Sequence, residues 1–142
     1  QMEGLPLPKF GFVDLNNELF NDSTVKGKIL VINCWFIHCQ PCLEEIPLLN
    51  QLAKTYSTYP NILFIGLAFD SAKNLKIFLK KTKFTYSIIP DQEDYLRNEL
   101  QISGYPAHLI VSGEGKIVKI IDGKLNAQKI ERINELINLS IK

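Results

Sequence analysis

Two cysteines separated by two residues are the side chains of this sequence best suited to chemistry. Cys39 and Cys42 flank Gln40 and Pro41, and Cys34 is the third cysteine of the chain. Thiolates attack disulfide bonds and bind soft metal ions, so such a pair indicates either redox exchange or metal binding. An odd number of cysteines does not suit the disulfide framework of a small secreted domain. The close pair therefore indicates a reactive site rather than a scaffold.

The pair follows a predicted buried strand and begins a predicted helix. Residues 29–36 form a nearly unbroken apolar run, typical of a central strand covered on both faces. Residues 41 to about 59 have helical periodicity. The apolar face of this helix consists of Cys42, Ile46, Leu49, Ala53 and Tyr56. Pro47 interrupts the helix and should kink it, because its ring nitrogen cannot donate a hydrogen bond to the Leu43 carbonyl.

This position predicts different roles for the two thiols. A helix N-terminus carries unsatisfied N–H groups and a partial positive charge, which stabilise a thiolate. We therefore expect the pKa of Cys39 to lie below the roughly 8.5 of a free thiol. Cys42 belongs to the apolar face and should point inward, whereas Cys39 should face solvent. We predict that Cys39 attacks a substrate disulfide and that Cys42 resolves the mixed disulfide.

Two other interpretations of the pair remain open at this point. A Cys-x-x-Cys motif can form half of a structural zinc site, which needs two further close ligands. The sequence contains no second Cys-x-x-Cys and no His-x-x-x-His motif. The pair can also be an inert disulfide, but a loop of four residues adds little stability through chain entropy.

The rest of the sequence alternates between predicted strands and helices. The expected strands cover residues 10–15, 18–20, 62–69, 86–89, 107–111 and 117–121. The expected helices cover residues 71–83, with Ser71 as N-cap, 92–100 and 126–139. The last two strands enclose a Ser-Gly-Glu-Gly turn and predict a hairpin. This order predicts an α/β fold with a mixed central sheet flanked by helices on both faces.

Length and composition limit the alternatives. A chain of 142 residues with 46% apolar residues and no linker predicts a single domain over residues 1–142. The net charge is +1 with acids and bases intermixed, which argues against nucleic acid as a partner. No apolar run approaches the roughly 18 residues that span a bilayer, and residues 1–9 lack the features of a leader. We expect no cofactor and no metal.

The segment around the pair resembles a known family. Residues 31–50, Val-Ile-Asn-Cys-Trp-Phe-Ile-His-Cys-Gln-Pro-Cys-Leu-Glu-Glu-Ile-Pro-Leu-Leu-Asn, are similar to the active-site segment of thioredoxin-fold proteins. They resemble more closely the TlpA/ResA-like branch, whose pattern is roughly N-F-W-A-x-W-C-x-P-C-x-x-E-x-P-x-L. The Gly-Tyr-Pro motif at residues 104–106, before an apolar strand, extends the resemblance over most of the chain. The resemblance implies a thioredoxin-like fold with an N-terminal strand extension and a central βα insertion within residues 62–89.

The resemblance also implies catalytic roles. Cys39 would be the nucleophile and Cys42 the resolving thiol. Glu45 matches a glutamate that lies near the cysteines in ResA-like members, and one helical turn separates it from Cys42. A role in proton transfer is geometrically reasonable. The alternative is a solvated acid in the first helical turn, which the helix dipole would also favour.

Four further residues are assigned to substrate binding. Pro106 matches the family's cis-proline, and such a turn would expose the backbone of Tyr105 to an extended substrate. Trp35 matches the tryptophan of the family pattern. His38 stands where the family usually has a tryptophan, and an imidazole there either lowers the pKa of Cys39 or is an exposed residue with little effect.

Two other departures concern residues inside predicted strands. Cys34 replaces a family aromatic residue and is expected to be a small buried side chain. Ala107 and His108 replace hydroxyl residues that are common after the cis-proline, and His108 is expected to be a satisfied strand residue rather than a ligand.

The resemblance implies a thiol–disulfide oxidoreductase that acts on protein thiols and disulfides together with a redox partner protein. It further implies an extracytoplasmic or periplasmic monomer, with a leader and a possible membrane tether outside this sequence. The alternative is a copper-binding chaperone of the same fold, in which Cys39, Cys42 and His108 bind Cu(I). Copper proteins of that kind have a longer Cys-x-x-x-Cys spacing. A peroxidase would need a lone cysteine in a pocket with Thr and Arg, which nothing here supplies.

Overall fold

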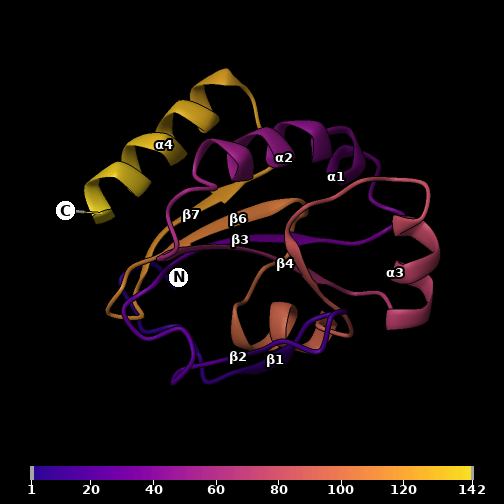
Figure 1. Ribbon diagram of the computed structural model, residues 1–142, viewed down its shortest axis with the longest axis horizontal. Helices are drawn as coiled ribbons and strands as arrows, with labels where there is room; N and C mark the ends of the chain where they lie inside the picture. Colours follow the sequence, from indigo (N-terminus) through magenta and orange to yellow (C-terminus); the bar gives the residue numbers. More distant parts are fainter. Residues whose placement is uncertain (1, 142) are drawn as a thin grey trace.

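The computed structural model describes residues 2–141, whose centre is a mixed sheet of five strands in the order β5-β4-β3-β6-β7. The three strands β3 (Ile29–Trp35), β4 (Ile62–Ala68) and β5 (Ser87–Ile89) run parallel to one another. The strand β6 (Ala107–Val111) pairs antiparallel with β3, and β7 (Ile117–Asp122) pairs antiparallel with β6. The predicted mixed α/β sheet and its closing hairpin are confirmed (Figure 1).

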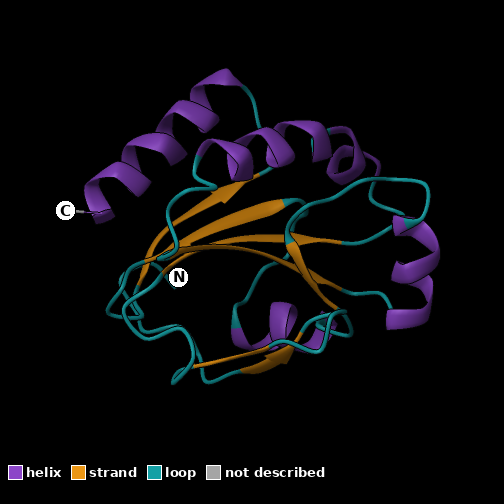
Figure 2. Ribbon diagram, in the orientation of Figure 1, coloured by secondary structure: helices purple, strands orange, loops and turns teal. Residues whose placement is uncertain are grey.

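Helices cover one face of this sheet. The helices α1 (Gln40–Glu44), α2 (Ile46–Thr55) and α4 (Ala127–Ile141) lie above the strands in the view of Figures 1 and 2. The helix α3 (Ala72–Leu79) lies at one end of the sheet and begins at the N-cap Ser71, whose side chain accepts a hydrogen bond from the Asn74 N–H, as the sequence predicts.

The opposite face carries a short helix and two strands. The strands β1 (Gly11–Val13) and β2 (Leu19–Asn21) form a separate antiparallel pair below the central sheet. The helical segment η1 (Tyr95–Glu99) lies beside them. The expected helix at residues 92–100 is therefore mostly a π-helical turn, because the Leu100 N–H donates to the Tyr95 carbonyl five residues back.

Strand β3 separates two apolar layers. All of its seven residues are buried. Val31 and Trp35 face the layer under α1, α2 and α4, whereas Ile32 and Cys34 face the layer over η1, β1 and β2. Successive side chains of a strand point to opposite faces, so both faces of a central strand need apolar cover. This arrangement explains the unbroken apolar run.

The single helix expected at residues 41–59 is in fact two helices. Helix α1 ends at Glu44, α2 begins at Ile46, and Glu45 caps both. The break precedes Pro47, which cannot donate to the Leu43 carbonyl, so the predicted kink becomes a full interruption. Helix α2 also ends at Thr55, four residues before the predicted end. The break places Glu45 at the junction of the two helices.

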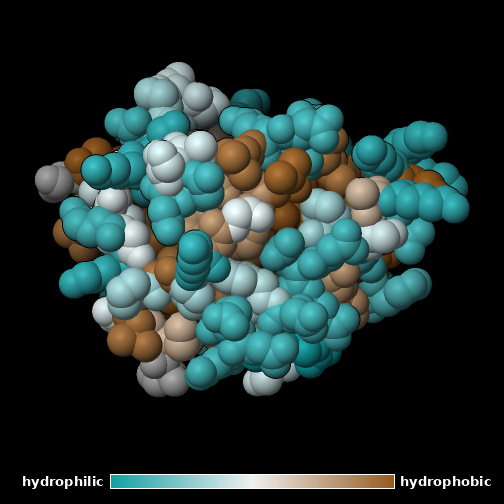
Figure 3. All heavy atoms as spheres, turned by 90° about the horizontal axis from the view of Figure 1, so that it is seen from below, coloured by the Kyte–Doolittle hydropathy of each residue, from teal (hydrophilic) through white to brown (hydrophobic). Residues whose placement is uncertain are grey.

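The surface on the side of β1, β2 and η1 is mainly hydrophilic, with apolar side chains at its centre and in smaller groups elsewhere (Figure 3). The exposed apolar side chains of this region include Val13 and Leu19, which pair across β1 and β2. Between residues 2 and 141, no helix has both the length and the apolar character that a membrane crossing requires.

Gly66 of β4 allows a close approach between the sheet and Trp35. A Cβ atom at this position would lie 3.0 Å from Cδ1 of Ile88 and 3.1 Å from Nε1 of Trp35. We expect Gly66→Ala to lower the free energy of unfolding by about 1–3 kcal/mol through overpacking, as measured by urea denaturation. Gly11→Ala is the matched control, since no atom lies within 4 Å of its added Cβ. Equal stability of the two variants would contradict this packing.

Candidate active site

The two cysteines of the motif form a disulfide at the start of α1. Cys39 is the N-cap of the helix, Pro41 occupies its first turn, and the Cα atoms of Cys39 and Cys42 are 5.2 Å apart. The Cys42 N–H donates to Sγ of Cys39 over 3.3 Å. The sulfur of Cys39 thus accepts a hydrogen bond that would favour a thiolate at the same place after reduction.

Hydrogen bonds hold the loop that leads to Cys39. The Cys39 N–H donates to the Phe36 carbonyl at 3.1 Å, and the Ile37 N–H donates to a carboxylate oxygen of Asp70 at 2.9 Å. Asp70 follows β4, so the two loops at this end of the parallel strands are joined directly. The site lies where the sequence places it, at the carboxyl end of a central strand.

Cys39 is less exposed than the sequence suggests. Its side chain was expected to face solvent, but Cys39 is only 5% exposed and Cys42 is 2% exposed. The bond to Cys42 and the hydrogen bond from the Cys42 N–H draw the Cys39 sulfur against the helix, which explains the difference. Cys39 remains the more accessible of the two sulfur-bearing residues.

Glu45 is a fully buried acid at the junction of α1 and α2. It is 0% exposed, which rules out the solvated first-turn acid considered above. One carboxylate oxygen accepts a hydrogen bond from the Leu125 N–H at 2.8 Å, and the other lies 2.9 Å from Nε2 of His108. A buried carboxylate needs such partners, because an isolated charge in an apolar layer is strongly unfavourable.

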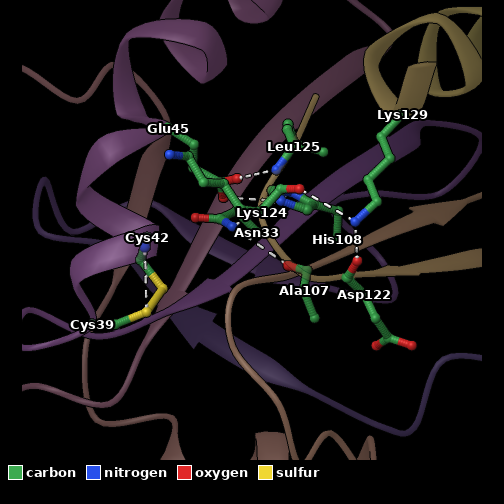
Figure 4. A network of polar contacts seen from close by, with 10 residues as sticks. All are labelled: Asn33, Cys39, Cys42, Glu45, Ala107, His108, Asp122, Lys124, Leu125 and Lys129. Carbon is green, nitrogen blue, oxygen red and sulfur yellow. Dashed lines mark hydrogen bonds and ion pairs between the residues drawn. A yellow bond between two sulfur atoms is a disulfide. The ribbon is translucent and has the colours of Figure 1, made fainter. Parts of the chain in front are cut away.

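His108 and Asn33 complete a polar group on the sheet beneath Glu45. They are direct partners in the register of β3 and β6, and both are buried. Nδ2 of Asn33 lies 3.4 Å from Nδ1 of His108 and 3.4 Å from the Ala107 carbonyl oxygen. Figure 4 shows Glu45, His108 and Asn33 converging from the helix junction and two strands, near the disulfide.

Two aromatic residues border this polar group. The hydroxyl of Tyr86 is buried without a hydrogen-bond partner among the described residues. Burial, and to a lesser degree the charge of Glu45, raises the pKa of Tyr86. Trp35 is fully buried against Phe78 and Phe84, with ring centroids 5.7 and 5.2 Å apart. The expected direct contact between Trp35 and a substrate does not fit this position.

Glu44, the neighbour of Glu45, points outward and holds the loop before α4. Nζ of Lys124 donates to a carboxylate oxygen of Glu44 at 2.6 Å, and Nε2 of Gln40 lies 3.4 Å from the other. The hydrogen bonds from Lys124 and Gln40 and the charge of Lys124 lower the pKa of Glu44. Because Lys124 precedes Leu125, this pair helps to keep the Leu125 N–H beside Glu45.

The remaining expected substrate-binding residues lie in the loops at the end of β3 and the start of β6, which pair with each other. The Tyr105–Pro106 bond is cis, as the resemblance implied, and it directly precedes β6. The ring of Tyr105 packs edge-on against Phe69 and Phe36, which stack on each other with centroids 4.9 Å apart. His38 is exposed beside Cys39. These residues form a partly apolar rim at the end of β3 that leads to Cys39.

Metal binding has no support in this geometry. In residues 2–141 no three side chains of His, Cys, Asp or Glu gather in an arrangement suited to a metal ion. Nε2 of His108 faces Glu45, and the two thiols are joined to each other. The third thiol, Cys34, is buried on the other side of β3, as expected of a small apolar side chain.

Comparisons with known proteins agree with this fold and site. A sequence model described as the AhpC/TSA family matches residues 4–120. A relative named thiol-disulfide oxidoreductase ResA, from Geobacillus kaustophilus, is 27% identical over 91% of this chain and 74% of its own length. The protein of the same name from Bacillus subtilis is 26% identical over 95% of this chain and 75% of its own length.

Solved structures show the same architecture. A structure from Chlorobium tepidum, described as a thiol:disulfide interchange protein DsbE, has a TM-score of 0.85 and 17% identity. The match covers 99% of this chain and 98% of the other. A thioredoxin family protein from Chlorobium tepidum TLS, described as a thiol:disulfide interchange protein, has a TM-score of 0.77 and 25% identity, covering 96% and 97% of the two chains. The thioredoxin-like fold is therefore shown.

Cys34 should be chemically silent in the folded protein. Burial raises the pKa of the Cys34 thiol, so little reactive thiolate forms near neutral pH. We expect iodoacetamide to leave the native oxidised protein unlabelled and to add one label per chain after unfolding in guanidinium, as measured by mass spectrometry. Rapid labelling of the native protein at Cys34 would contradict its placement between the sheet and η1.

Proposed function

The chain belongs to the AhpC/TSA family, and from this premise we propose how its Cys39–Cys42 pair exchanges electrons with other proteins. The chain is a thiol–disulfide oxidoreductase, like the relatives whose names describe that activity. The observation that carries this function is the Cys39–Cys42 disulfide at the start of α1, within the thioredoxin-like fold. Copper binding is not favoured by any of these findings.

The proposed reaction begins with the reduced pair. The Cys39 thiolate attacks one sulfur of a substrate disulfide, which forms a mixed disulfide and releases the other substrate sulfur as a thiolate. Cys42 then loses its proton and attacks Sγ of Cys39. The bond between Cys39 and the substrate breaks, the second substrate thiolate leaves, and the Cys39–Cys42 disulfide forms. The substrate gains two electrons, and the chain loses two.

Glu45 is proposed as the acceptor of the Cys42 proton. Residues three apart on a helix are neighbours, with Cβ atoms about 5–6 Å apart. Cys42 and Glu45 are both buried in the layer under α1 and α2, where bulk water has little access to the Cys42 thiol. The Glu45 carboxylate, one helical turn from Cys42, can act as a base beside the Cys42 thiol. Run in the opposite direction, the same group returns the proton when the disulfide is reduced.

Substrate proteins are proposed to lie against the rim beside the disulfide. The backbone of Tyr105 directly precedes β6, where an extended segment can add hydrogen bonds to the end of the strand. Pro106 and His38 would contact the same segment near Cys39. Trp35 is proposed to support the Cys39 loop from below, through its packing against Phe78 and Phe84.

The cellular compartment is proposed from the chemistry of disulfide bonds. Protein disulfides form and persist mainly outside the cytoplasm, so we place this domain in an extracytoplasmic compartment, where a membrane tether outside residues 1–142 would hold it. All proposed catalytic groups come from one chain, which is consistent with a monomer. A second redox protein must restore the starting state of the pair after each turnover.

The Cys42→Ser variant tests the assignment of the two thiols. Without a resolving thiol, the mixed disulfide at Cys39 should persist. We expect the reduced variant to form a stable adduct with a model disulfide peptide, which peptide mapping locates at Cys39. Cys39→Ser is the matched control and should form at least about tenfold less adduct, because Cys42 is the more deeply buried. An adduct chiefly at Cys42 in the corresponding experiment would reverse the two roles.

The Glu45→Gln variant tests the proton acceptor. The reduced protein is mixed with dithiobis(nitrobenzoate), whose first coloured thiolate reports the attack by Cys39 and whose second reports resolution by Cys42. Glutamine keeps the shape of the side chain but cannot take a proton. We expect the second phase at pH 7 to slow by about tenfold or more. A pH profile of resolution that matches the unsubstituted protein would remove Glu45 from the mechanism.

A further inference from the structure

We propose that His108 is a positioning residue for the resolution step, which holds the Glu45 carboxylate in place to accept the Cys42 proton. Asn33 in turn holds the imidazole of His108 in the tautomer that this task requires. The proposal rests on the proposed function of Glu45 as proton acceptor. It adds a residue that acts on the reaction through Glu45 without touching the substrate.

The sheet register places the imidazole below the carboxylate. Asn33 of β3 and His108 of β6 are paired directly across the two central strands. Both side chains are about 1% exposed and lie on the sheet face covered by α1 and α2. Glu45, at the junction of α1 and α2, faces the same point, and Oε2 of Glu45 and Nε2 of His108 are 2.9 Å apart.

The contacts of Asn33 select one tautomer of His108. Nδ2 of Asn33 lies 3.4 Å from the Ala107 carbonyl oxygen, which can only accept a hydrogen bond. The amide nitrogen therefore faces Nδ1 of His108, also at 3.4 Å, and Nδ1 must be the unprotonated acceptor. The hydrogen of a neutral His108 then resides on Nε2, the atom nearest to Glu45.

The carboxylate retains capacity for a proton in this arrangement. Oε1 of Glu45 accepts from the Leu125 N–H, whereas Oε2 and Nε2 are close but not aligned as a hydrogen bond. A carboxylate has about four lone-pair sites, so Oε2 can take a proton while it stays beside the imidazole. The contact with His108 therefore holds the carboxylate beside the imidazole without using all of its acceptor sites.

Among residues 2–141, His108 is the basic side chain that contacts the Glu45 carboxylate. The titratable groups near Glu45 are Cys39 at the N-cap of α1, Cys42 on α1, Tyr86 before β5, and His108 on β6. Lys124 precedes Leu125, but its ammonium pairs with Glu44 on the surface. Loss of His108 would remove the imidazole beside Oε2 and leave the Leu125 N–H as the hydrogen-bond donor to the buried carboxylate.

The His108→Leu variant removes both ring nitrogens at similar volume. In the two-phase assay, we expect the first phase to change by less than about twofold, because Cys39 does not depend on Glu45. The second phase should slow by about tenfold at pH 7, and the midpoint of its pH profile should shift, because the carboxylate that accepts the proton loses the imidazole beside it. His108→Gln places an amide N–H near the position of Nε2 and should restore most of the rate and the midpoint.

Two further variants separate positioning from packing. Ile110→Val loosens the same face of β6 and should leave the pH midpoint unchanged. In the double variant with Glu45→Gln, His108→Leu should slow resolution no further, because His108 acts through Glu45. If His108→Leu does not fold, His108→Asn, which lacks an atom at the Nε2 position, carries the same expectation.

The possible results separate the two proposals. The role of His108 would be overturned if the pH midpoint of resolution is unchanged in His108→Leu. It would also be overturned if His108→Leu slows resolution equally at every pH and His108→Gln does not restore the rate. An additive loss in the double variant would overturn it as well. Absence of the first phase in the unsubstituted protein would instead contradict the proposed function of the pair.

Discussion

Glu45 places a carboxyl group among apolar side chains, where a charge without partners costs several kcal/mol. Three separate parts of the chain meet at this group. Glu45 itself lies at the junction of α1 and α2, the β3–β6 register brings His108 beneath it, and the loop before α4 supplies the Leu125 N–H. These elements are far apart in sequence, so the buried acid constrains how the helices can sit on the sheet.

In the proposed mechanism, Glu45 also links proton transfer to electron transfer. Closing the Cys39–Cys42 disulfide removes protons from both thiols, and the inner thiol lies in a layer closed to bulk water. A helix N-terminus can stabilise an anion at Cys39 but cannot accept a proton from Cys42. The proposed mechanism therefore needs two different groups within one helical turn. One is a hydrogen-bond donor for the Cys39 sulfur, and the other is a base for the Cys42 thiol.

Local sequence signals predict most of the fold and the location of the site. The apolar run of β3, the Cys-x-x-Cys motif after it and the position of Pro47 each depend on near neighbours in the chain. The cis bond at Pro106 is confirmed, but it was expected from the family resemblance alone. The break at Glu45 follows from Pro47, which follows it by two residues.

The contacts of Glu45 are not predictable in this way. They depend on Leu125, 80 residues away, and on the pairing of Asn33 with His108, 75 residues apart. Periodicity places His108 in a strand but does not say which face it occupies or what lies above it. For the same reason the burial of Trp35 and of the Cys39 sulfur becomes visible only once the loops and helices are assembled around them.

Strand β3 also separates the Cys34 sulfur from the sulfurs of Cys39 and Cys42. Cys34 is only five residues from Cys39, yet the alternation of the strand sends its thiol into the layer over η1, while the pair lies in the layer under α1. A stray thiol within reach would attack the working disulfide and trap the protein in an unproductive isomer. With the sheet as a partition, the folded chain can cycle between its two oxidation states without scrambling its own bonds.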